Sequence, residues 1–498
     1  MSKAIEQFLE SLYLPRQALL FGFAVVGAVG AALVAGQQMV LQPVELGPLC
    51  RVCAGVPNGA QLVARMIVLH HREWLAQPVD LTWLFYVNVA LVYAIQVGPV
   101  LTFGLWATRR LAPYPQHRPT VRFLCLIPAH NEERVIANSV SSLLRQTYPR
   151  ELFEVWVVSD GSTDATEENA RRHGARVLRT GVRASGKAKA LARAYDELLD
   201  EGERGRYVCV IDADNWVAPN FLAEMNNAIC ERGYECLQGF HDVLNGTANW
   251  ITKSVWLNSI ASSVLYNPGR FRSLGTALLC GTGWCCEADL LRRYWSSIKT
   301  QTEDIELTGL LLLHEGIGVA WVDSAHIYDE KPLTLWSAIR QRQRWMTGHM
   351  RVARRLCWAL LREGVRRRDA RLIELAAYYM VPFAMNAGNL QMLLVVGMNL
   401  GLLAVQGPLG WAGWQWGVMA VTLLYVFVYQ IVGFALETGL WGPAVLYSVY
   451  CAVFSFVAWV PALVWACFTV WRTDWIFHTP HFATAAVPAS AERHLRAR

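Results

Sequence analysis

The chain has 498 residues, of which 54% are hydrophobic and only 17% are charged, and its net charge is +6. This length allows one globular domain of ordinary size together with several membrane segments. The positive charge is concentrated beside apolar stretches, where it indicates membrane topology, so it gives no reason to expect a nucleic-acid partner.

Four long stretches contain no Lys, Arg, Asp or Glu, and each is longer than the about 20 apolar residues that cross a bilayer. The first is also longer than the apolar part of a signal peptide, so we interpret it as a retained helix. The sequence therefore predicts a multi-pass integral membrane protein. The four stretches comprise residues 17–44, 81–108, 375–436 and 438–471.

Arginines border the second and third stretches, among them Arg109 and Arg110 on one side and Arg366, Arg367 and Arg368 on the other. Because basic residues remain on the cytoplasmic side, both ends of the central domain are expected in the cytoplasm, at the inner or plasma membrane. We divide the chain into an N-terminal region with two transmembrane helices (1–118), a cytoplasmic domain (119–332), amphipathic interface helices (333–372), C-terminal transmembrane helices (373–472) and a cytoplasmic tail (473–498).

Two points of this topology stay open. Cys50 and Cys53 lie between the first two stretches, on the expected outside, where they form either a local disulfide or unpaired thiols. Gly407-Pro408 and Gly439–Pro443 divide the last apolar region into three stretches, and the number of spans there, two, three or four, stays open.

The central domain alternates apolar runs with helical periods, which predicts an α/β fold. Continuous apolar runs at 123–128, 154–159 and 207–211 are typical of buried parallel strands, and helices are expected over 134–146, 164–172 and 187–200. A further strand is expected at 277–280, before a tight turn at Gly281-Thr282-Gly283.

Polar residues follow the first three predicted strands, where ligands bind in open α/β sheets. His130, Asn131 and Glu132 follow the first strand and Asp160 ends the second. Asp160 either accepts hydrogen bonds from a base or ribose or caps the next helix, for which Asp164 is the other candidate.

Asp212 and Asp214 follow the third strand two positions apart, so their side chains point to the same side. Two such carboxylates suit a hard cation that neutralises a diphosphate, although a polar turn would also carry them. Lys187 begins a predicted helix, where it either contacts phosphate or uracil or is solvated.

The sequence Thr302-Glu303-Asp304 begins a helix predicted over 305–314. Thr302 suits the N-cap, and acids in the first turn are stabilised by the helix dipole, which should depress the pKa of Asp304. A carboxylate of this kind still serves as a base if it takes the proton only as the new bond forms.

In the interface region, Gln341, Arg344 and Trp345 have the spacing of one helix face. Arginine suits a phosphate, and tryptophan offers a flat face to a sugar ring. Membrane anchoring is the alternative, and it accounts for the neighbouring Arg340 and Arg342.

These motifs, in this order between residues 121 and 350, resemble those of processive family-two glycosyltransferases of the cellulose, chitin and hyaluronan synthase group. The resemblance implies a nucleotide-diphospho-sugar transferase domain of the A type, with a mixed, mostly parallel sheet. The stretch from Tyr328 to Pro332 is also similar to bacterial members. The departures are Ser159, where many relatives have a second acid, and residues 475–481, which are only loosely similar to the loop that closes over the donor.

Each matching position then carries an implied role. The donor, a UDP-sugar, would be bound by the loop 130–132, Lys187, Gln341 and Arg344, and Asp304 would be the general base. Gly281, Thr282, Thr302, Glu303 and Trp345 would contact the acceptor. Asp160 would hold the uridine, and Asp212 and Asp214 would bind the donor, Asp214 through Mg²⁺ or Mn²⁺.

The predicted function is inverting, processive transfer of a UDP-activated hexose, glucose or N-acetylglucosamine, onto a growing polysaccharide that is exported through the membrane. Two alternatives remain: a single transfer onto a ceramide or polyprenyl-phosphate lipid, and a non-catalytic membrane transporter or scaffold. The sequence leaves the linkage, the oligomeric state and any envelope or export partner open.

Overall fold

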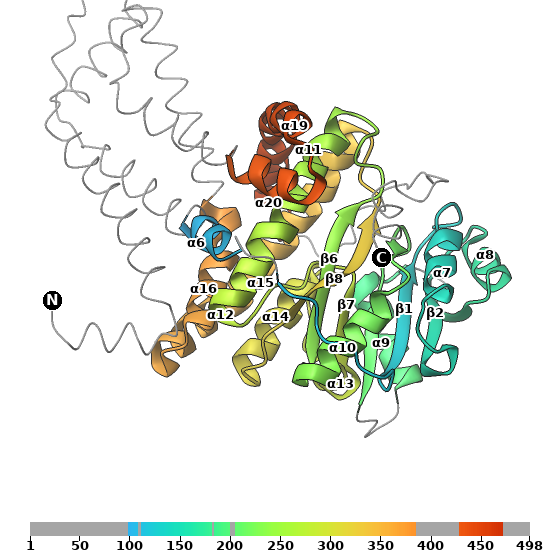
Figure 1. The fold of residues 1–498 in the computed structure, drawn as a ribbon. Helices are drawn as coiled ribbons and strands as arrows, with labels where there is room; N and C mark the ends of the chain where they lie inside the picture. Colours follow the sequence, from blue (N-terminus) through green and yellow to red (C-terminus); the bar gives the residue numbers. More distant parts are fainter. Residues whose placement is uncertain (1–97, 108–110, 182–183, 200–204, 385–427, 472–498) are drawn as a thin grey trace, which may run out of the picture. The chain divides into compact units, whose positions relative to one another are not determined.

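The structure is a computed structural model, and it describes residues 98–107, 111–181, 184–199, 205–384 and 428–471 (Figure 1). The chain forms two compact units. The first comprises Met1–Leu19, Pro99–Pro382 and Phe427–Arg498, and it holds nearly all described residues. The second comprises Leu20–Gly98 and Phe383–Val426.

An eight-stranded mixed sheet forms the centre of the first unit, in the order β3-β2-β1-β4-β7-β6-β8-β5. Strands β3, β2, β1 and β4 are parallel, β7 is antiparallel to its neighbours β4 and β6, β8 is parallel to β6, and β5 is antiparallel to β8. The predicted α/β fold with a mixed, mostly parallel sheet is confirmed. The strands are β1 Arg122–Ala129, β2 Phe153–Asp160, β3 Arg176–Gly181, β4 Arg206–Val210, β5 Trp216–Val217, β6 Cys236–Val243, β7 Trp284–Glu287 and β8 Ala320–Asp329.

Helices cover the sheet, and α11, α12, α15 and α16 extend beyond the side of the sheet that contains β6 and β8 (Figure 1). The predicted helices near the strand ends correspond to α7, α8, α9 and α14. The helices of the domain are α6 Gly98–Trp106, α7 Ile136–Leu144, η3 Arg150–Leu152, α8 Thr166–Arg172, α9 Lys187–Leu198, α10 Phe221–Arg232, α11 Trp250–Ala261, η4 Ser262–Tyr266, α12 Asn267–Leu274, α13 Ala288–Trp295, α14 Glu303–His314, α15 Leu335–Arg367 and α16 Ala370–Tyr379.

The central strands are buried on both faces, which explains their continuous apolar runs. In β1, Phe123, Cys125 and Ile127 join one core cluster with residues of α7 and α10, and Leu124 and Leu126 alternate to the other face. All five side chains are at most 1% exposed. The three strands predicted from these runs are confirmed as β1, β2 and β4.

The strand predicted at 277–280 is wrong. Only Ala277 makes a bridge there, to Val319, and strand β7 begins at Trp284, after the turn. The segment is not part of a ladder because side chains take up its amides: Leu278 N–H donates to Asn267 Oδ1 at 3.2 Å.

The interface region forms one long helix, α15, followed by α16. Asp369 accepts a hydrogen bond from Arg371 N–H at 2.9 Å and thereby caps α16. The predicted helices of this region are therefore present, and their position at a membrane stays a prediction.

Among the residues that the structure describes, one helical run is long and apolar enough to cross a membrane: Trp441–Thr469, with a mean hydropathy of 2.1. It consists of α19 Trp441–Phe454, the π-helix η5 Ser455–Trp459 and α20 Val460–Thr469. Both π-helices of the described chain precede a proline, Pro268 or Pro461, whose ring cannot continue the regular hydrogen-bond ladder. The first predicted span, residues 81–97 of the second, Cys50, Cys53, the tail and residues 475–481 lie outside the described residues, and α6 covers most of the described part of the second span.

Candidate active site

A cavity of about 530 Å³ lies at the ends of strands β1, β2 and β4 and is closed from the other side by α14 and α15. Every predicted site residue except Asn131 lines it, so residues from positions 130 to 345 meet in one place. Their individual roles remain predictions. The predicted residues that line it are His130, Glu132, Asp160, Lys187, Asp212, Asp214, Gly281, Thr282, Thr302, Glu303, Asp304, Gln341, Arg344 and Trp345.

Asn131 shapes the loop after β1 and is not part of the cavity wall. Its φ of 57° is in the left-handed region, which asparagine tolerates better than most residues. Its Oδ1 accepts a hydrogen bond from Thr163 N–H at 2.8 Å, and its own N–H donates to Ser162 Oγ at 3.2 Å. The side chain therefore joins this loop to the one after β2.

Asp160 is buried at the end of β2 and organises the loop before α9. Its Oδ2 accepts hydrogen bonds from Ser185 N–H (2.8 Å) and Gly186 N–H (2.7 Å), and its Oδ1 accepts from Ser185 Oγ (2.8 Å) and Thr180 Oγ1 (3.2 Å). The alternative that Asp160 caps the following helix is wrong, because Asp164 bonds Thr166 N–H at the start of α8. Asp160 thus fixes the start of α9 as well as lining the cavity.

Lys187, the first residue of α9, is the charged centre of the cavity. Its Nζ lies 2.7 Å from Asp212 Oδ1 and 2.9 Å from Glu303 Oε1, and it donates to the Gly281 carbonyl at 2.6 Å. Although burial opposes its charge, these two carboxylates raise the pKa of Lys187. The solvated alternative for this lysine is therefore wrong.

The two aspartates after β4 have different surroundings. Asp212 is paired with Lys187, and its N–H donates to Thr282 Oγ1 at 2.9 Å. Burial and the neighbouring Asp214 raise the pKa of Asp212, and Lys187 opposes them. Asp214 lines the same cavity, and its carboxylate is of the kind that binds a hard cation. Within the described chain, no group of three or more His, Cys, Asp or Glu side chains is arranged as a metal site.

Asp304 lies in the first turn of α14, next to Glu303, which pairs with Lys187. Burial, and then the negative charge of Glu303, raise the pKa of Asp304 to about 7. The expectation that the helix dipole depresses this pKa is wrong, because desolvation outweighs the helix terminus. Thr302 is the N-cap residue as predicted, but its hydroxyl makes no capping hydrogen bond.

Gln341, Arg344 and Trp345 line the cavity from one face of α15, as their spacing predicted. Arg342 is buried and does not line the cavity. Its guanidinium lies 4.3 Å from the ring centre of Phe454 and 5.1 Å from that of Trp459. The interpretation of Arg342 as a membrane-surface residue is wrong, and burial lowers its pKa to about 9. It is a core cation held between aromatic rings.

Other cavity residues were not predicted: His241, Asp329, Lys331, His349 and Tyr378. Three of them carried a sequence signal. His349 is four residues after Trp345, on the same face of α15, and Asp329 and Lys331 belong to the stretch that resembles bacterial relatives. Lys331 Nζ is paired with Asp329 Oδ2, at the end of β8.

Parts of the chain are similar to known proteins. Residues 125–306 match the family Glycosyl transferase family 2. "Probable glycosyltransferase YdaM" of Bacillus subtilis is 26% identical over 239 residues, which are 46% of this chain and 55% of the relative. "Beta-monoglucosyldiacylglycerol synthase" of Synechocystis is 29% identical over 245 residues, 47% of this chain and 48% of the relative.

Among solved structures, a mannosyltransferase from Pyrobaculum calidifontis, in complex with GDP-Man and Mn²⁺, has a TM-score of 0.48 and 18% identity, covering 78% of this chain and 99% of its own. The chain spans about half the length of the curated relatives that it matches.

Proposed function

We propose that the protein transfers a hexose from a UDP-sugar to an acceptor hydroxyl, with inversion at the sugar carbon. One observation carries this proposal: Asp214 at a strand end, Asp304 with its raised pKa and Arg344 on α15 line the same cavity. The reaction needs three groups in one place: a carboxylate for the cation on the diphosphate leaving group, a base, and a basic side chain that binds phosphate.

In this mechanism Asp304 takes the proton of the acceptor hydroxyl as that oxygen attacks the sugar carbon. A pKa near 7 makes this carboxylate a stronger base than an ordinary aspartate, and it is still ionised in a large fraction of molecules at neutral pH. The bond between the sugar carbon and the diphosphate breaks as the new bond forms, so the linkage inverts.

The departing diphosphate is stabilised from two sides. Asp214 would hold Mg²⁺ or Mn²⁺, which supplies charge neutralisation when bound. Arg344 approaches from α15 with the planar donor fork that matches phosphate oxygens. Lys187 holds Asp212 and Glu303 in place and keeps the two carboxylates from repelling each other.

We propose a growing polysaccharide as the acceptor, extended processively with glucose or N-acetylglucosamine and exported through a multi-pass inner or plasma membrane. The motif Gln341-x-x-Arg344-Trp345 supports this proposal, because it joins the donor side to an aromatic face for a sugar. The apolar run Trp441–Thr469 supports it too, since α15 packs against it through Ala338 and Ile339.

A lipid acceptor is the second candidate, with a single transfer to a hydroxyl of a membrane lipid. Two further curated relatives, from Nostoc and Trichormus variabilis, are also called "Beta-monoglucosyldiacylglycerol synthase", each 28% identical over 231 residues. This repeated name among the relatives favours a glycolipid product.

The test is product analysis with radiolabelled UDP-glucose and UDP-N-acetylglucosamine in membrane vesicles containing the full chain. A polymer that resists organic extraction supports the polysaccharide proposal. A single-sugar product in the organic phase would replace it with the lipid candidate. No UDP release from any donor, with the Asp304→Asn variant behaving identically, would favour a non-catalytic membrane protein.

A further inference from the structure

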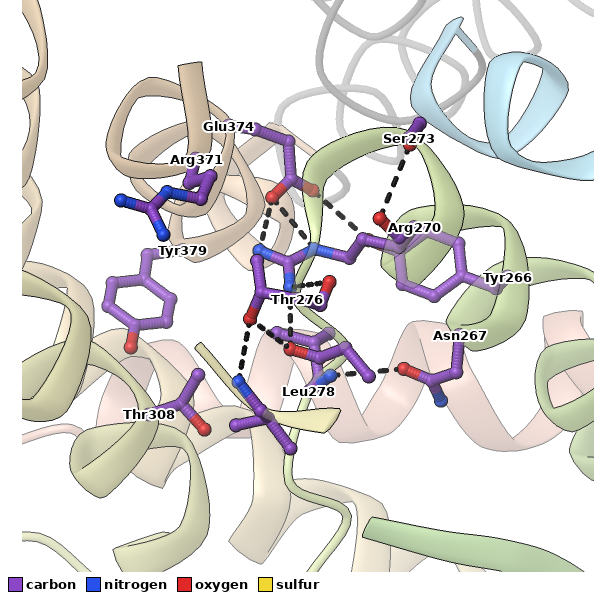
Figure 2. Close-up of polar contacts among 12 residues, drawn as sticks. Tyr266, Asn267, Arg270, Ser273, Thr276, Leu278, Thr308, Arg371, Glu374 and Tyr379 are labelled. Carbon is purple, nitrogen blue, oxygen red and sulfur yellow. Dashed lines mark hydrogen bonds and ion pairs between the residues drawn. The ribbon is translucent and has the colours of Figure 1, made fainter. Parts of the chain in front are cut away.

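A buried ion pair outside the cavity joins α12 to α16. Arg270 is fully buried, and its Nε and Nη2 donate to Glu374 Oε2 at 2.8 and 2.5 Å (Figure 2). Its Nη1 donates to the carbonyl oxygens of Thr276 at 2.9 Å and Ala277 at 2.6 Å. One planar guanidinium therefore holds a carboxylate of α16 and the backbone that follows α12.

The backbone held by Arg270 leads directly into the cavity wall, which contains residues 278–282. This segment has no strand ladder of its own. Side chains bind its amides instead: Asn267 Oδ1 accepts from Leu278 N–H, as Figure 2 shows, and Gln238 Oε1 accepts from Cys280 N–H at 2.8 Å. The position of this segment therefore depends on side-chain contacts. The charged guanidinium of Arg270 holds the two residues just before it, Thr276 and Ala277.

The same segment touches the charged centre of the site. The Gly281 carbonyl accepts the hydrogen bond from Lys187 Nζ at 2.6 Å, and Thr282 Oγ1 accepts the one from Asp212 N–H at 2.9 Å. Lys187 in turn contacts Glu303, next to Asp304. A shift of segment 278–282 would therefore move the groups that surround the proposed base.

Helix α16 also contacts the helix that carries the base. Tyr379 Oη donates to the Ile305 carbonyl at 2.6 Å, one residue after Asp304. Glu374 is five residues earlier on α16. One helix thus contacts the base helix α14 at one end and, through Arg270, the loop that faces the base.

Resting on the proposed glycosyl transfer, we propose that Arg270 and Glu374 are positioning residues that set the distance between segment 278–282 and Asp304. Neither residue lines the cavity. Misplacing a reacting group by about 1 Å can cost about 100-fold in rate, so the pair should act on the chemical step more than on donor binding.

The experiment uses the full chain in lipid nanodiscs and measures UDP release against donor concentration. Glu374→Gln keeps the shape of the side chain and removes its charge, and Arg270→Lys keeps the charge and removes the planar fork. For both we expect kcat to fall about 10-fold or more, with the donor KM changed by less than about 3-fold. Glu374→Asp, which restores the charge, should recover part of kcat.

Asp369→Asn is the matched control, because it weakens another ion pair of α16, Asp369 with Arg371, which contacts neither Thr276 nor Ala277. Thermal unfolding of each variant measures the stability cost. The inference is overturned if Glu374→Gln lowers the unfolding temperature as Asp369→Asn does and leaves kcat at the wild-type value. A wild-type chain that releases no UDP would overturn the proposed function itself, which is a distinguishable result.

Discussion

The two walls of the cavity are built in different ways. In the wall at the strand ends, protein groups already satisfy the charges: Asp160 accepts backbone amides, and Lys187 pairs with Asp212. In the α15 wall, Gln341 Oε1 is buried and has no hydrogen-bond partner among the described residues. Its neighbour Arg344 is half-buried on the same helix face.

This difference has a physical consequence. A wall whose charges balance each other is preorganised, and removing one member leaves another charge buried without compensation. A wall with an unsatisfied polar atom can gain a hydrogen bond from a ligand. Changes in the first wall should therefore cost stability, and changes in the second should cost affinity.

Asp304→Asn should have the largest effect, because Asp304, in the first turn of α14, is the proposed base for the acceptor proton. The amide cannot take that proton, so kcat should fall by about 1,000-fold. Initial rates of UDP release at saturating donor measure it. Donor affinity, measured by displacement of labelled UDP, should stay near the wild-type value, and a kcat within tenfold of wild type would exclude Asp304 as the base.

Lys187→Met should have the next largest effect, on stability. It leaves Glu303, which is only 4% exposed in its side chain, without a counter-charge, at a cost of about 3 kcal/mol. Thermal unfolding in detergent should show a lower midpoint. Adding Glu303→Gln should restore part of that loss, and a double variant no more stable than Lys187→Met would contradict the charge-balance explanation.

Arg344→Gln tests the second wall and should leave the unfolding midpoint unchanged. Losing one charged hydrogen bond to phosphate should raise the donor KM about tenfold. Steady-state kinetics over a range of UDP-sugar concentrations measure the change. Arg340→Gln on the same helix is the control, since that residue does not line the cavity. An equal rise in KM for both variants would mean that general charge on α15 acts, and not contact with the donor.

The strand-end wall could be predicted well from the sequence, because its signals are local. Continuous apolar runs marked the buried strands β1, β2 and β4, and the polar residues directly after them lie at the predicted edge. The spacing of Gln341, Arg344 and Trp345 was likewise enough to place them on one face of a helix.

What could not be predicted depends on contacts between distant parts of the chain. Lys187 is buried because Gly281 and Glu303 reach it, and Arg342 is in the core because Phe454 and Trp459 surround it. The raised pKa of Asp304 has the same origin, since tertiary burial outweighs the helix terminus that the sequence does reveal.

The smallest expected effect is a shift in the pH dependence of kcat/KM. It tests whether the charges of the strand-end wall also affect the proposed base, Asp304. With the pKa of Asp304 at about 7, its protonated form predominates below that pH, so kcat/KM should fall about tenfold per pH unit on the acid side and level off above.

Glu303 contributes to the raised pKa of Asp304 through its negative charge. Glu303→Gln should therefore lower the pKa of Asp304 and move the acid limb to lower pH, whereas Glu315→Gln, at the far end of α14, should leave it in place. The pH profile of kcat/KM for the three proteins measures this. An acid limb that stays in place or moves to higher pH in Glu303→Gln would contradict the assigned effect of the Glu303 charge on Asp304.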